Sequence, residues 1–90
     1  MSKIVHNEPF QSSRNGMRQI TVDAWTGSAT LYALAGSKTG TPILVDNGAL
    51  SADGIITFYA VSDQWFRVTI AGDAEAWITG WLLYLQLYQQ

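Results

Sequence analysis

The 90-residue sequence contains no cysteine, so neither a disulfide framework nor a thiolate metal site can support the fold. A chain of this size buries only roughly 60 to 65% of its unfolded surface, which supplies one hydrophobic core and not two. Small domains without disulfides or metals depend on a dense core or on a partner subunit. Length and cysteine count therefore predict a single domain held together by packing.

Charge is also scarce. Charged residues make up 13% of the chain, against about a quarter in an average soluble domain, while 48% of the residues are hydrophobic and 12% are aromatic. A surface with so little charge is expected to be partly covered by another protein. The net charge of −2 and the pI near 4.9 argue against a nucleic-acid partner, which normally requires clustered Lys and Arg.

The sequence has no apolar run of the roughly 18 residues that a membrane-spanning helix needs. Its start, from Met1 to His6, lacks the apolar stretch of a signal peptide. We therefore expect no membrane partner and a soluble protein that is made in a cytosol.

Groups that could carry catalysis are few. The single histidine, His6, lies far in sequence from the serines of the body, so a Ser-His-Asp arrangement would require the N-terminal residues to fold back. Most acidic residues lie in turns, where aspartate usually accepts hydrogen bonds from nearby backbone N–H groups. The segment 46–48 begins like a calcium loop but lacks the alternating oxygen ligands. The sequence predicts a protein that is not an enzyme and has no metal and no cofactor.

Residues 1–16 differ from the rest of the chain, because they are polar and turn-rich with isolated apolar residues at Ile4, Val5 and Phe10. Lys3, Arg14 and Arg18 give the first 18 residues a net charge of +2, whereas the remainder carries −4. We interpret residues 1–16 as an extended N-terminal arm that packs on a neighbouring subunit or capsid, with a disordered tail as the alternative. The candidate partner-binding residues are Lys3, Ile4, Val5, Phe10, Arg14, Arg18 and Trp25.

From residue 17 to 90 the pattern indicates a single β domain, because apolar residues alternate with period two between short glycine-containing turns. The pattern predicts strands over residues 19–25, 29–34, 43–45, 49–51, 55–61, 65–70 and 76–79. Asp46-Asn47-Gly48 and Asp53-Gly54 are typical hairpin turns, and 55–61 is expected to pair with 65–70. The fold expected is a small antiparallel β-sandwich or barrel, immunoglobulin-like or tulip-like.

The C-terminal run from Trp81 to Gln90 fits either a helix or a strand, and we predict a strand because no helix N-cap precedes it. The four tryptophans could form a sugar-binding platform, but Trp65 and Trp77 fit better as core or interface anchors. Trp25, at a strand end beside Thr26-Gly27, is the tryptophan expected to be exposed.

Four segments between Ala29 and Ile70 resemble a known family. Ala29-Thr30-Leu31-Tyr32, Gly48–Gly54, Ile56–Ala60 and Trp65–Ile70 are together similar to the small β-modules of tailed-bacteriophage virions, found in head-decoration proteins and tail-fibre connectors. An Asp-Gly turn followed by aromatic strands also occurs in other immunoglobulin-like repeats. The resemblance implies a sandwich or tulip-like barrel that binds the virion or the host surface, and it brings no catalytic or ligand residues with it.

Three functions follow as hypotheses. The first is a non-enzymatic virion structural protein, assembled in the host cytoplasm, that decorates the capsid. It would form a homo-oligomer, with a trimer expected, and dock on virion proteins such as the major capsid protein through its arm. The second is a carbohydrate-binding module of a tail fibre or adhesin that binds a host-surface glycan through Trp25 and nearby aromatics. The third is a small hydrolase.

Overall fold

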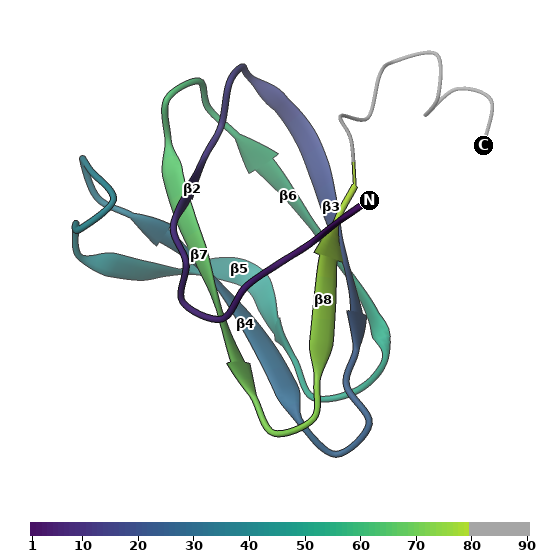
Figure 1. Ribbon diagram of the computed structural model, residues 1–90. Coiled ribbons are helices and arrows are strands. Elements are labelled where there is room, and N and C mark those ends of the chain that lie inside the picture. Colours follow the sequence, from purple (N-terminus) through teal and green to yellow (C-terminus); the bar gives the residue numbers. More distant parts are fainter. Residues whose placement is uncertain (80–90) are drawn as a thin grey trace, which may run out of the picture.

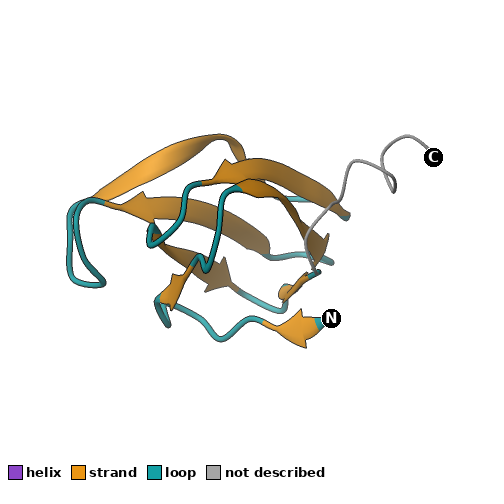
Figure 2. Ribbon diagram, turned by 90° about the horizontal axis from the view of Figure 1, so that it is seen from above, coloured by secondary structure: helices purple, strands orange, loops and turns teal. Residues whose placement is uncertain are grey.

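The computed structural model describes residues 1–79, which form eight strands and no helix (Figures 1 and 2). The all-β prediction is therefore confirmed. The strands are β1 (Ser2–Lys3), β2 (Phe10–Gln11), β3 (Gly16–Asp23), β4 (Ser28–Leu34), β5 (Pro42–Leu50), β6 (Gly54–Ala60), β7 (Trp65–Ala71) and β8 (Glu75–Ile78). The predicted strand over 81–90 lies outside the described residues.

The strands form two antiparallel four-stranded sheets that pack on each other as a small β-sandwich. Sheet A has the order β1-β8-β3-β6, and sheet B has the order β2-β7-β4-β5. Each sheet thus has a two-residue strand at one edge and a longer strand, β6 or β5, at the other. The connection 51–53 carries the chain from the long edge strand of sheet B to that of sheet A.

The core lies between the sheets and follows the period-two pattern of the sequence. The predicted inward face of β3 and the residue after it is confirmed, since Ile20, Val22 and Ala24 are at most 1% exposed. Opposite them, Leu31 and Val68 of sheet B are fully buried. Phe66 packs its ring against Phe58 in an edge-on arrangement at 5.1 Å and stacks on Phe10 at 5.8 Å. Aromatic rings from three strands therefore bind the two sheets together.

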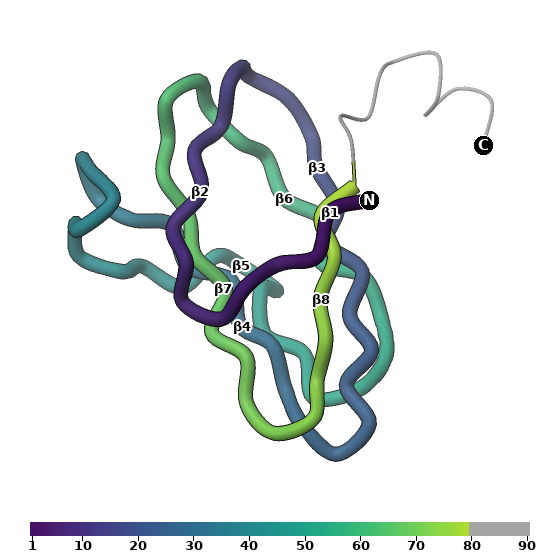
Figure 3. Tube along the Cα trace, in the orientation of Figure 1, coloured from purple at the N-terminus to yellow at the C-terminus, as the bar shows by residue number. Residues whose placement is uncertain are grey.

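Residues 1–16 do not form an arm that leaves the domain, so that expectation is corrected. β1 pairs with β8, with Ser2 opposite Ile78, and β2 pairs with β7, with Phe10 opposite Phe66. Figure 3 shows the segment crossing from β8 of one sheet to β7 of the other. The sequence did not predict β1 and β2, because strands of only two residues are too short to show an alternating pattern within a polar, turn-rich segment. The isolated apolar residues Ile4 and Phe10 fill this chain's own core.

Three local predictions were also wrong. Asp53-Gly54 is not a hairpin turn, because it leads from β5 of sheet B into β6 of sheet A. Segments 55–61 and 65–70 are joined by a short turn but do not pair as a hairpin, because β6 belongs to sheet A and pairs with β3 while β7 lies in sheet B. Asp46-Asn47-Gly48 does not separate two strands. It lies in a bulge of β5, where the pairing with β4 shifts between Thr30 and Tyr32, and Asn47 takes the left-handed φ of 57°.

Candidate interaction surface

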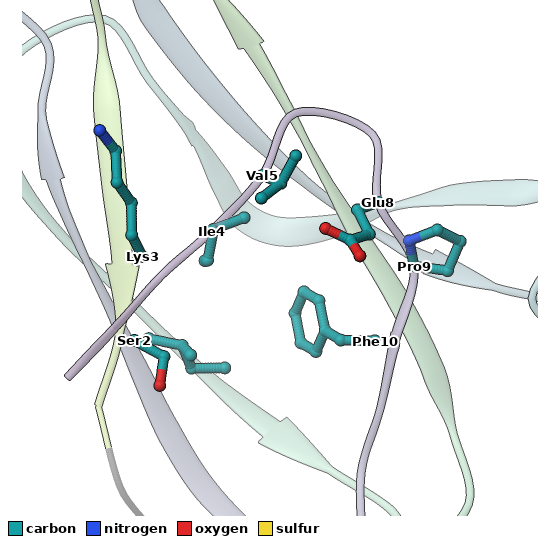
Figure 4. A pocket seen from close by; sticks show the side chains of 8 residues that line it. Ser2, Lys3, Ile4, Val5, Glu8, Pro9 and Phe10 are labelled. Atoms are coloured by element: carbon teal, nitrogen blue, oxygen red, sulfur yellow. The ribbon is translucent and has the colours of Figure 1, made fainter.

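Four of the seven predicted partner-binding residues surround one pocket of about 210 Å³ where the N-terminal segment crosses between the sheets. Figure 4 shows the side chains of Ile4 and Phe10 on opposite sides of this pocket, with Glu8 and Pro9 beside Phe10. Ile4 is only 7% exposed, and Phe10 packs on the core. The pocket is thus a surface hollow at the edge of the core, and Ile4 is the one buried residue that lines it. It is lined by Ser2, Lys3, Ile4, Val5, Glu8, Pro9, Phe10 and Ile78.

Lys3 and Val5, which flank Ile4, remain on the surface. Lys3 Nζ lies 2.9 Å from Oε2 of Glu75 on the neighbouring strand β8, an exposed ion pair worth about 0 to 1 kcal/mol. Val5 is 59% exposed. Alternation along the segment therefore turns Ile4 inward and leaves Val5 as the apolar side chain that a partner could reach.

The two arginines predicted to guide a partner lie close to each other, but Arg18 is only partly accessible. Its Nη2 donates a hydrogen bond to the carbonyl oxygen of Thr79 at 3.0 Å. Partial burial, and then the positive charge of Arg14, lower the pKa of Arg18. Arg18 therefore helps to close one end of the sandwich, whereas Arg14 is exposed.

Trp25 lies on the turn between β3 and β4 and is 60% exposed, as predicted for it. Its backbone has a left-handed φ of 44°, which is uncommon for a residue other than glycine. Two aspartates fix the backbone on either side of it. Asp53 Oδ1 accepts a hydrogen bond from Ala24 N at 2.8 Å, and Asp73 accepts two from Thr26. The indole thus lies on a turn whose backbone is hydrogen-bonded on both sides of Trp25.

The hydrogen bonds that Asp73 accepts from Thr26 are expected to depend on pH. Hydrogen bonding from the Thr26 side chain, and then from backbone N–H groups, outweighs desolvation and lowers the pKa of Asp73. A carboxylate with a depressed pKa stabilises the fold above its unfolded pKa and loses that contribution as the pH falls through its folded pKa. Below pH 3.8, the ordinary pKa of an aspartate carboxyl, the Thr26 amide resonance should therefore shift as Asp73 becomes protonated. An amide that is equally insensitive to pH in the wild type and in Asp73→Asn would contradict this.

The structure also exposes apolar residues that were not among the predicted site residues. Ile43 and Leu44 of β5 are 58% and 55% exposed, and Ile55 and Tyr59 of β6 are 54% and 57% exposed. Both faces of β6 are apolar in sequence, so alternation alone could not show which face is outward. The packing of sheet A on sheet B decides this, since it buries Ile56 and Phe58 and leaves Ile55 and Tyr59 on the outer face.

The outer face of sheet B carries a second group, in which the Arg67 guanidinium lies 5.7 Å from the centre of the Tyr32 ring, a cation–π arrangement. These two residues lie directly opposite each other on β7 and β4. Among the described residues, no cluster of three or more His, Asp or Glu could hold a metal ion. In residues 1–79 no helix has the length and apolar character to span a membrane.

No family model, no curated protein and no solved structure matches this chain.

Proposed function

We propose that this protein is a non-enzymatic structural protein of a bacteriophage virion, a capsid decoration subunit that associates with itself and binds the particle surface. The observation that carries the proposal is the set of large apolar side chains on the long edge strands of the sandwich. Ile43, Leu44, Ile55 and Tyr59 are each more than half exposed. Burial of these side chains against another protein would remove their apolar surface from water.

The small charged fraction supports the same proposal, because a surface with few charges has little to keep copies apart. The docking route differs from the one that the sequence predicted. Since Ile4 and Phe10 belong to the core, they are not available to a capsid. The proposed contact with other virion proteins is therefore made by the folded sandwich itself.

Mass spectrometry of particles purified from cells that make the protein tests this proposal. A decoration subunit should be present in a fixed whole-number ratio to the major capsid protein, since it occupies equivalent positions on a symmetric shell. Absence of the protein from washed particles, or an amount that varies between preparations, would contradict the proposal.

Binding of a host-surface glycan by a tail fibre or adhesin is the second candidate, and the exposure of Trp25 favours it. An indole that is 60% exposed on a firmly held turn can stack on the apolar face of a sugar ring. The aromatic ring contacts recorded among the described residues join Phe10, Phe58 and Phe66, so Trp25 would act without a stacked neighbour. A glycan-array signal that disappears in Trp25→Ala, with an unchanged unfolding temperature, would favour this function over decoration.

A further inference from the structure

We propose that β6 is a self-association strand, which pairs in antiparallel fashion with β6 of a second copy and joins two A sheets into one continuous sheet. The proposal deepens the self-association part of the proposed function and rests on it. It assigns the interface to one strand and the symmetry to a two-fold axis.

Comparison of the four sheet edges singles out β6. The short edge strands β1 and β2 have two residues each, and the long edge strand β5 contains Pro42, Asp46 and a bulge at Asn47. Short length, proline, charge and bulges are the usual means by which proteins prevent a sheet edge from pairing. β6, Gly54–Ala60, has seven regularly paired residues with neither charge nor proline.

The backbone groups at this edge can be located from the ladder inside sheet A. The N–H and C=O groups of successive residues in an antiparallel strand point alternately to the two neighbouring strands. On β3, the carbonyl of Gln19 accepts from Thr79 N at 3.0 Å, on the β8 side, so Ile20 faces β6, where it lies opposite Ile56. The residues whose backbone groups face away from β3 are therefore Ile55, Thr57 and Tyr59.

No strand among the described residues pairs with this side of β6. The same three residues have exposed side chains on the outer face of sheet A, while Ile56 and Phe58 between them are buried in the core. The edge thus offers both backbone hydrogen bonds and apolar side chains, which are the two components of strand addition.

The sequence of β6 is complementary to itself when two copies run antiparallel about a two-fold axis at Thr57. Thr57 then lies opposite Thr57 of the second copy, and Ile55 lies opposite Tyr59 of the second copy. Thr–Thr and aromatic–β-branched pairs are among the favourable cross-strand pairs.

Charge supports a second copy as the occupant. In the same register the nearest carboxylate, that of Asp53, lies opposite Val61, so no acidic residue meets another across the seam. A chain of net charge −2 can therefore approach its own copy along this uncharged strand. A two-fold seam produces a dimer, whereas the trimer expected from the sequence would require a different contact.

The first test is the solution mass at micromolar concentration, by sedimentation velocity. The wild type should sediment at twice the 9.9 kDa chain mass. Thr57→Lys places two like charges at the axis and should raise the dimer dissociation constant about fivefold or more. Mixing Thr57→Lys with Thr57→Glu should restore a dimer, because opposite charges then meet. Thr21→Lys, on β3 of the same sheet, is the control and should remain dimeric.

A second variant keeps the proposal testable if charge at position 57 disturbs the fold. Because the chain has no cysteine, Thr57→Cys introduces a single thiol. The two Thr57 residues would form a hydrogen-bonded pair, and such pairs in an antiparallel ladder have Cα atoms about 5.5 Å apart, within the range that a disulfide spans. Mild oxidation should convert Thr57→Cys into a covalent dimer and leave Thr21→Cys a monomer on denaturing gels.

A wild type at one or three chain masses would overturn the two-fold seam, as would an equal loss of dimer in Thr21→Lys or failure of the opposite charges to restore it. These outcomes are independent of the decoration proposal. A protein found at a fixed ratio on particles but monomeric in solution would support decoration and contradict the β6 seam. A protein that is dimeric in solution but absent from particles would support the seam and contradict decoration.

Discussion

Removing residues 1–11 is expected to leave a chain that is largely unfolded at room temperature. The deletion removes both short edge strands, the buried side chain of Ile4 and the Phe10 ring that stacks on Phe66. Loss of a single buried aliphatic side chain costs about 2 to 5 kcal/mol, and a whole domain has only about 5 to 15 kcal/mol of stability. Circular dichroism and the dispersion of amide resonances would measure the loss.

A pair of adjacent substitutions separates a specific role from a general effect of truncation. Ile4→Ala should lower the free energy of unfolding by about 2 to 5 kcal/mol, whereas Val5→Ala, at a position 59% exposed, should change it by no more than about 0.5 kcal/mol. Equal and small effects at both positions, together with a folded truncated chain, would show that residues 1–16 are a dispensable tail.

Phe66→Ala is expected to have the largest effect of any single substitution considered, a loss of about 3 to 5 kcal/mol in the free energy of unfolding. Phe66 is 2% exposed and is the ring that touches both Phe10 and Phe58, so its removal leaves a cavity between three strands. Urea titration measures this loss, with Trp25→Ala as the control at an exposed aromatic position, where a change within about 0.5 kcal/mol is expected. Comparable midpoints for both variants would contradict the central position assigned to Phe66.

Much of the fold could be predicted from alternation alone. Ile20 and Val22 of β3, and Phe66 and Val68 of β7, are apolar residues at alternate positions, and the structure buries them as the pattern indicates. Partner choice between strands could not be predicted in this way. A short turn joins 55–61 to 65–70, yet the chain crosses from sheet A to sheet B there. The crossing places Phe58 and Phe66 in opposite layers, where their rings meet in the core.

The candidate site was less accessible to sequence reasoning. Apolar residues in a polar segment, such as Ile4 and Phe10, fit an arm that binds a partner and a segment that completes its own domain equally well. Only the positions of β7 and β8 decide between the two. For β6 the missing information was also topological, since the seven uncharged residues of Gly54–Ala60 could equally have formed a buried central strand.

The pairing of β1 with β8 also bears on the order in which the protein folds. Ser2 leaves the ribosome well before its partner Ile78, which follows only after all the strands between them have been made. Contacts so far apart in sequence slow folding, because a long loop must close before they form. The short strands β1 and β2 therefore complete the two sheets last. Until they do, the edges of β7 and β8 are exposed and can pair with other chains. Folding intermediates with open edges of this kind aggregate readily, which makes refolding yield a sensitive measure of N-terminal variants.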